Sequence, residues 1–241
     1  MSQQGPSDLS HLEVRINQYR RDRRKFSLNV YFLALIFLAI SIIQWLSLMF
    51  CETCVEIIEE CYYIPMIFIL LGLATVTVIV FFPRLRFMFP LNWILTLTIV
   101  ELITLGLTLA VINVSVTSMG IFLSAVMVIV MLCLAFGMFV KFDITLNVVI
   151  LFICSIVFFV GMVFFLTIFL VSGMYFTIVA YSIFIIGIVM MFLMYHSQTI
   201  QGGRYAEMRL KDYLLGALII YHDFVIILLA FLALDVHILK L

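Results

Sequence analysis

The feature that most constrains this chain is a series of apolar runs, each about as long as a membrane span. A helix needs about 20 apolar residues to cross the hydrocarbon core of a bilayer. Of the 241 residues, 66% are hydrophobic and 11% are charged, whereas soluble domains carry about 25% charged residues. The runs show no two-residue alternation of the kind found in barrel strands. Because backbone polar groups in lipid must be satisfied internally, the sequence predicts an all-α membrane protein.

Seven runs are long enough to span a membrane, so we expect a bundle of seven transmembrane helices. Residues 1–27 should form a basic tail, and residues 28–241 should form one transmembrane domain. The first run lacks a small-residue cleavage site, so we expect it to be retained as an anchor. The expected helices are about 28–50, 64–82, 91–111, 119–140, 146–170, 174–195 and 213–234.

The basic residues predict the orientation of the bundle. Every Lys and Arg except Lys240 falls in the tail or in the loops after the second, fourth and sixth expected helices. The positive-inside rule therefore predicts a cytoplasmic N-terminus, and the basic tail should attract anionic membrane lipid. Arg84 and Arg86 should anchor the cytoplasmic boundary, or either could reach inward to a carboxylate. An alternative with six spans, in which the last helix re-enters, would return the C-terminus to the cytoplasm.

The loop after the first helix is acidic and carries three of the five cysteines, which are Cys51, Cys54 and Cys61. On the lumenal side two of these could form a disulfide. The Cys-Glu-Thr-Cys sequence resembles half of a zinc site, but no second ligand pair or histidine lies nearby in the sequence, so we expect no metal. The net charge of the chain is zero, and no nucleic-acid partner is implied.

The sequence contains none of the motifs of soluble enzymes, so we expect neither an enzyme nor a bound cofactor. The apolar runs contain few ionisable residues: Glu101, His196, His222 and Asp223. A charged side chain at the centre of a bilayer costs about 2.5–3.5 kcal/mol on insertion scales, which predicts a partner or a function for each. We expect His222 to point to headgroups or to a neighbouring helix.

His196 is the nearest candidate partner of Asp223, and two interpretations of it remain open. In one, His196 contacts Asp223; in the other, it is hydrated and unpaired at the membrane boundary. If the two touch, the ion pair persists while the histidine is protonated and the aspartate is ionised, so the contact should be strongest in mild acid. Glu101 is either a second acidic site along an ion path or a protonated carboxyl bonded to Thr98 or Thr104.

Five short motifs occur in order along the chain, and together they resemble those of the transmembrane Bax-inhibitor motif family, most closely its lifeguard branch. The similarity runs from about Arg21 to Leu234. The motifs are Phe89-Pro90-Leu91-Asn92; Lys141-Phe142-Asp143-Ile144-Thr145; Tyr195-His196-Ser197-Gln198 followed by Gly202-Gly203-Arg204; Tyr213 with Ala217-Leu218; and Tyr221-His222-Asp223.

The resemblance implies a seven-helix bundle of the Bax-inhibitor type, a pH-sensitive calcium leak and inhibition of apoptosis. It implies an intracellular membrane, either endoplasmic reticulum or Golgi, with the plasma membrane as an alternative. In the family, two aspartates on the sixth and seventh helices form a pH-sensitive latch. Asp223 stands at one of these positions, and His196 stands where the family has the other. The Asn that the family has after the second aspartate is missing here, where the stretch is Asp223-Phe224-Val225-Ile226.

These departures leave an alternative function open. In it, the chain is a diverged, channel-inactive member that modulates cell death by binding other membrane proteins of cell-death or calcium pathways. A G-protein-coupled receptor is disfavoured, because the predicted topology is inverted and neither Asp-Arg-Tyr nor Asn-Pro-x-x-Tyr is present.

Overall fold

The computed structural model describes the backbone of residues 6–238 and the side chains of residues 11–234. Lys240, the one basic residue expected beyond the last helix, lies outside the described residues. Within the described part the chain is helical, and seven helices are long and apolar enough to cross a membrane. The prediction of seven transmembrane helices is therefore confirmed by length and composition.

The helices follow one another with short connections. The seven candidate spans lie in α1 (Pro6–Met49), α3 (Tyr63–Phe81), α4 (Leu91–Gly106) with α5 (Thr108–Ile112), α6 (Val116–Phe139), α7 (Val148–Ser172), α8 (Tyr175–Gln201) and α9 (Tyr213–Ile238). A short helix, α2 (Glu52–Glu60), follows α1, and two 3₁₀ turns, η1 (Leu85–Phe87) and η2 (Ile144–Asn147), precede α4 and α7.

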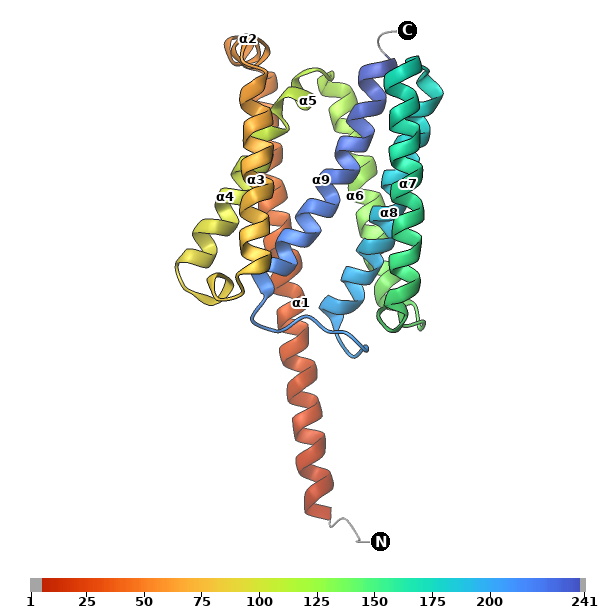
Figure 1. Cartoon of the computed structure of the whole chain (residues 1–241). Coiled ribbons are helices and arrows are strands. Elements are labelled where there is room, and N and C mark those ends of the chain that lie inside the picture. Colours follow the sequence, from red (N-terminus) through yellow and green to blue (C-terminus); the bar gives the residue numbers. More distant parts are fainter. Residues whose placement is uncertain (1–5, 239–241) are drawn as a thin grey trace.

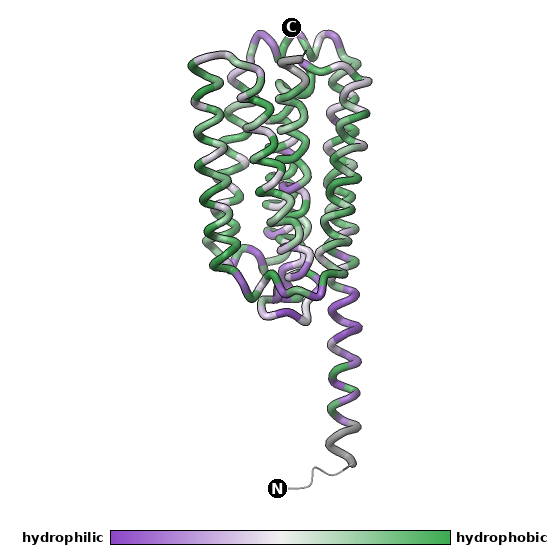
Figure 2. The backbone as a smooth tube through the Cα atoms, turned by 90° about the vertical axis from the view of Figure 1, so that its right-hand side faces the viewer, coloured by the Kyte–Doolittle hydropathy of each residue, from purple (hydrophilic) through white to green (hydrophobic). Residues whose placement is uncertain are grey.

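The helices form an upright bundle with two distinct ends (Figure 1). The first part of α1 projects beyond the bundle at the end that carries the loops after α3, α6 and α8, and we call this the basic end. The opposite end carries α2 and α5. Figure 2 shows hydrophobic residues over most of the height of the bundle and hydrophilic residues at its loops and along the projecting part of α1.

Helix α9 is the central element of the bundle. It packs against α1, α4, α6 and α8. In the most apolar 18-residue stretch of α9, 61% is buried inside the bundle, whereas only 6% of the corresponding stretch of α7 is buried. Tyr221, Phe224 and Leu228 on α9 are fully buried. Helix α7 is apolar on all sides and largely exposed, as expected for a helix that faces lipid. Figure 1 shows α9 crossing from the basic end to the opposite end, rather than turning back as in the six-span alternative.

Two expected boundaries are wrong by six residues or more. Helix α1 begins at Pro6 rather than near residue 28, so it runs continuously through the expected tail. Helix α8 ends at Gln201 rather than at residue 195. Arg, Lys and Gln, which occur in the added segments, are good helix formers in water. The end of an apolar run therefore marks the membrane boundary without ending the helix.

The third expected helix is interrupted near its end, between α4 and α5. The Thr108 hydroxyl donates to the Leu105 carbonyl at 2.7 Å, and the Ala110 N–H donates to the Leu107 carbonyl at 3.0 Å. Such hydrogen bonds, three residues back along the chain, tighten the backbone and are typical of a break in a helix. The two segments together still form one candidate span.

Candidate functional site

The candidate site is a contact between His196 on α8 and Asp223 on α9. The Nδ1 atom of His196 lies 2.8 Å from Oδ2 of Asp223. Asp223 is 7% exposed, and His196 is half-buried. The contact exists because α8 continues past the expected boundary at Tyr195, so that His196 is held on the helix beside α9 rather than in a mobile loop. The structure thus brings together the two residues that the sequence offers as partners.

The ring of His196 is oriented by its neighbours on α8. It stacks on Phe192, with ring centroids 6.0 Å apart and planes 25° apart, and Tyr195 meets its edge at 5.8 Å. The next residue, Ser197, donates a hydrogen bond to the Leu134 carbonyl on α6 at 2.8 Å. At Gly137 a Cβ atom would lie 2.8 Å from the Met194 carbonyl oxygen, so glycine allows α6 and α8 to approach. This packing fixes the side of α8 that faces Asp223.

His222 is a second histidine beside the site, and it is turned toward its own helix. Its Nδ1 lies 2.7 Å from the Leu218 carbonyl oxygen, so this nitrogen donates. Its Nε2 is buried and makes no hydrogen bond within the described residues. Tyr221 meets the ring edge-on, with centroids 5.6 Å apart. From the sequence, we expected His222 to point to lipid headgroups or to a neighbouring helix. Its hydrogen bond is instead to the backbone of its own helix, α9.

Polar side chains also meet deep in the bundle, where α1, α4 and α9 pack. The hydroxyls of Ser41 and Thr104 lie 2.6 Å apart, and the Tyr221 hydroxyl lies 3.1 Å from each. The Trp45 Nε1–H donates to the Thr104 carbonyl at 2.9 Å. Tyr221, singled out only as a motif residue, therefore joins three helices. Figure 2 shows hydrophilic positions within the bundle between its two polar ends.

Glu101 is next to this cluster along α4, but its partner differs from the one expected. Gln44 on α1 donates to both Glu101 carboxylate oxygens, at 2.9 and 3.0 Å. The expectation of a hydrogen bond from Thr98 or Thr104 is therefore wrong, since Thr104 bonds to Ser41 and Tyr221 instead. Glu101 belongs to the half-buried interior and is not part of the contact between His196 and Asp223.

The two arginines of the loop after α3 have different positions. Arg84 is exposed. Arg86 reaches inward, and its Nη1 lies 3.5 Å from Oδ1 of Asp212, a carboxylate that is 7% exposed at the start of α9. The alternative in which an arginine reaches a buried carboxylate thus describes Arg86. Asp212 was missed by sequence reasoning because it lies outside the apolar run, although it directly precedes Tyr213.

A second ion pair at the basic end joins α1 to the loop between α8 and α9. Arg23, which is 5% exposed, lies 2.6 Å from Glu207 through its Nη2 and donates through Nη1 to the Met208 carbonyl at 2.6 Å. Tyr19 and the Gly203 N–H also donate to the Glu207 carboxylate. Burial by itself would raise the pKa of Glu207, but these hydrogen bonds and the Arg23 charge lower that pKa below its ordinary value.

We expect Glu207→Gln to lower the free energy of unfolding by about 2 kcal/mol near neutral pH, because hydrogen bonds to charged groups contribute about 1.5–3 kcal/mol. A carboxylate whose pKa is lowered by folding stabilises the fold at pH values above its ordinary pKa of about 4. This stabilisation is lost as the pH falls through the lower pKa of the folded state. Thermal melting temperatures of the native chain and Glu207→Gln in detergent should therefore differ at neutral pH and converge in strong acid.

The control is Glu59→Gln, which changes an exposed carboxylate on α2. It should melt like the native chain at every pH. An equal shift in Glu59→Gln would contradict the prediction.

Most of the remaining motif residues connect loops at the basic end. Gln198 donates to the Phe142 carbonyl at 2.9 Å and accepts from the Ile144 N–H at 2.8 Å. Asp143 accepts hydrogen bonds from Thr145 and from the Tyr205 N–H. Burial would raise the pKa of Asp143, whereas these bonds and the Arg204 charge lower it. This part of the motif therefore ties the loop after α6 to the loop after α8.

Three further motif residues are explained by backbone conformation or by packing. Gly202 and Gly203 both have positive φ, near 72° and 71°, a region that glycine adopts without strain. At Gly202 the Arg23 guanidinium occupies the space that a side chain would need. Tyr213 contacts Trp93 on α4, with ring centroids 6.4 Å apart. These residues hold the start of α9 and the end of α8 in place.

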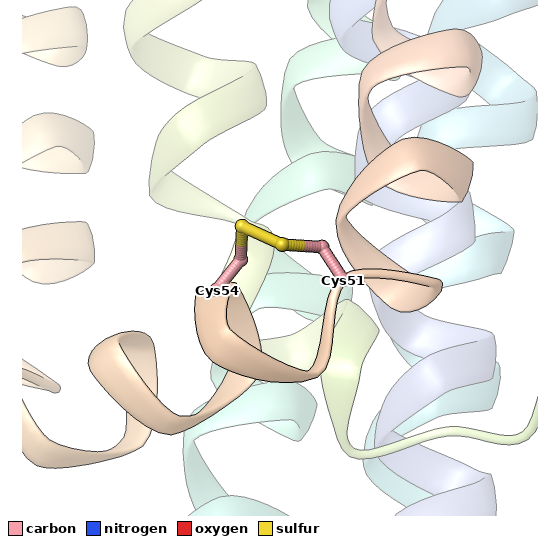
Figure 3. Close-up of a disulfide and its surroundings, with 2 residues drawn as sticks. All are labelled: Cys51 and Cys54. Carbon is pink, nitrogen blue, oxygen red and sulfur yellow. A yellow bond between two sulfur atoms is a disulfide. The ribbon is translucent and has the colours of Figure 1, made fainter.

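At the opposite end of the bundle, two of the three cysteines of the acidic loop form a disulfide. Cys51 is bonded to Cys54 at the start of α2 (Figure 3). Cys61 is a free thiol just beyond the end of α2. The sequence did not indicate which two of the three cysteines are bonded. In the structure the bond joins Cys51 and Cys54, which are three residues apart.

Comparison of the chain with known protein families finds no family that matches, and comparison with curated proteins finds no match. A proposal of function therefore rests on the chemistry of the chain's own residues and on the motif resemblance described above. A carboxylate that is 7% exposed in an apolar bundle attracts cations strongly, because the local dielectric constant is low. A histidine in contact with it can neutralise that charge and can release it again when it loses its proton.

Proposed function

We propose that the chain is a diverged member of the Bax-inhibitor motif family, of the lifeguard branch, and that it lets calcium ions leak across an intracellular membrane. The proposal places the chain in the endoplasmic reticulum or Golgi, with the N-terminus in the cytoplasm, and assigns it a role in limiting cell death by lowering stored calcium. The observation that supports it best is the contact between His196 and Asp223. These are the two positions at which the resemblance implies a pH-sensitive pair.

The polar groups of the interior supply a physical basis for ion passage. Besides Asp223, the interior holds the hydroxyl cluster of Ser41, Thr104 and Tyr221 and the pair of Glu101 with Gln44. Hydroxyl and carboxylate oxygens are the ligands that calcium prefers. In the proposed mechanism, the protonated His196 neutralises Asp223 and keeps α8 and α9 together, so the path is closed. Loss of that proton frees the carboxylate and weakens the contact between the helices.

The proposal is tested by calcium flux into liposomes that contain the purified chain and a trapped calcium dye. We expect flux well above that of protein-free liposomes of the same lipid composition, with an ionophore giving the full dye response in both. Absence of flux from mildly acidic to mildly alkaline pH, in correctly folded protein, would overturn the leak. It would favour the alternative, an interaction protein without channel activity.

A further inference from the structure

A large groove lies at the basic end of the bundle, between α1 and the end of α8. Its volume is about 810 Å³, which falls within the range of about 300–1,000 Å³ typical of ligand sites. Arg20 and Arg24 line it from α1, and Gln201 and Gly203 line it from the other side. A Cβ atom added at Gly203 would have no other atom within 4 Å, so there is open space next to Gly203 in the loop after α8.

The groove carries a net positive charge. Arg20 and Arg24 are exposed, lie one helical turn apart and make no ion pair or hydrogen bond among the described residues. Arg23 also lines the groove, but its charge is matched by Glu207. None of the described side chains that line the groove is acidic. Two guanidinium groups are therefore free to bind an anion.

A second, apolar groove continues from the first toward the middle of the bundle. It has a volume of about 200 Å³ and lies between α1 and α6. Leu35 and Leu38 line it from α1, and Ala135 lines it from α6. Tyr31 and Met138 line both grooves, so the two adjoin. The charged groove thus lies next to an apolar groove beside the membrane-spanning part of α1.

This combination matches the chemistry of one kind of ligand. Arginine binds phosphate oxygens through two parallel hydrogen bonds, and basic pockets between membrane helices bind anionic headgroups. The apolar groove suits an acyl chain, whereas a free phosphate ion has no group to fill it. An extended peptide would leave its backbone polar groups unsatisfied at that depth. We propose that the groove binds one anionic phospholipid, with its phosphate between Arg20 and Arg24 and an acyl chain against Ala135.

The site is tested by binding of fluorescent phosphatidylserine to the purified full-length chain in detergent micelles. We expect Arg20→Gln/Arg24→Gln to weaken binding about tenfold or more, since each basic residue near a membrane surface contributes about 1 kcal/mol to attraction of anionic lipid. The matched control is Arg21→Gln/Lys25→Gln, which removes the same charge from neighbouring positions of α1 that line a separate groove. It should leave binding within about twofold, because only the first pair lines the groove.

The apolar half is tested with a bulky side chain. Ala135→Phe should fill the second groove and weaken phosphatidylserine binding, whereas Leu132→Phe, at an exposed position on the same helix, should not. Phosphatidylcholine should compete poorly, and inorganic phosphate or glycerophosphoserine should not displace the lipid. Thermal melting of each variant confirms that it is folded.

Three outcomes would overturn the proposal. An equal loss in the two double variants would show a diffuse surface attraction rather than a site. Displacement of the lipid by inorganic phosphate would show a site for soluble anions. Full binding in a folded Ala135→Phe variant would show that the lipid does not use the apolar groove. None of these results bears on calcium flux, so the leak and the lipid site fail independently.

Discussion

Asp223→Leu is expected to reduce calcium flux in liposomes by at least about tenfold, because the variant loses the attraction between the carboxylate and the cation. Two unit charges about 4 Å apart attract by roughly 4 kcal/mol near a protein surface. Each 1.4 kcal/mol corresponds to a factor of ten. The leucine removes the most buried carboxylate of the proposed path and replaces it with a side chain that cannot bind a cation. The fold should survive, because His196 is half-buried and keeps its ring contacts with Phe192 and Tyr195 on α8.

Asp223→Asn is the matched variant, since it keeps the shape of the side chain and a hydrogen bond to His196 but removes the charge. Flux should fall in this variant too, if the charge rather than the contact carries the ion. Helical content and thermal melting, measured on both variants, separate a loss of function from a loss of fold. Native flux through a folded Asp223→Leu protein would make Asp223 a structural residue, and the proposed leak would lose its main support.

Calcium flux through the native chain is expected to rise at least about tenfold from mildly acidic to mildly alkaline pH, because a hydrogen bond between charged groups contributes about 1.5–3 kcal/mol. Histidine exchanges its proton between about pH 5 and 8. In the proposed mechanism the contact between His196 and Asp223, which are 2.8 Å apart, is closed while the histidine carries a proton and the aspartate is ionised. The pair weakens as the histidine loses its proton, so flux rises with pH.

Three variants identify the group that titrates. In His196→Asp two carboxylates share a proton, so the profile should be displaced from that of the native chain. In His196→Gln the hydrogen bond to Asp223 can persist but the imidazole is gone, and the rise should disappear. His222→Gln removes the other nearby histidine and should keep the native rise. Superimposed profiles for the native chain and His196→Asp would show that His196 takes no part in a latch.

Sequence reasoning reached the membrane class and the seven spans because both depend on properties that add up along the chain. Apolar residues in runs of about 20 require helices in lipid, whatever the helices pack against. The two ionisable residues His196 and Asp223 also stood out, since charge in an apolar run is costly. Whether they touch could not be decided, because α8 continues to Gln201 on residues that are polar and give no periodic signal.

Other parts of the site depend on partners far away in the sequence. Arg23 and Glu207 are separated by 184 residues. In the sequence, neither residue can be distinguished from an ordinary charged residue at a membrane boundary. One of the two interpretations of Glu101 paired it with a threonine on its own helix, but its partner Gln44 lies on α1. Local spacing predicts neighbours on one helix, whereas these contacts depend on which faces of different helices meet.

The sequence by itself determined that this is a helical membrane protein, where its spans lie and which ionisable residues fall in the apolar runs. It did so because hydropathy and the cost of charge in lipid act on each segment separately. Only the tertiary structure decided that α9 is central, that His196 meets Asp223, that Arg86 reaches Asp212 and that Arg20 and Arg24 face a groove. Those outcomes depend on how helices rotate and approach one another, and packing of side chains from several helices at once sets that arrangement.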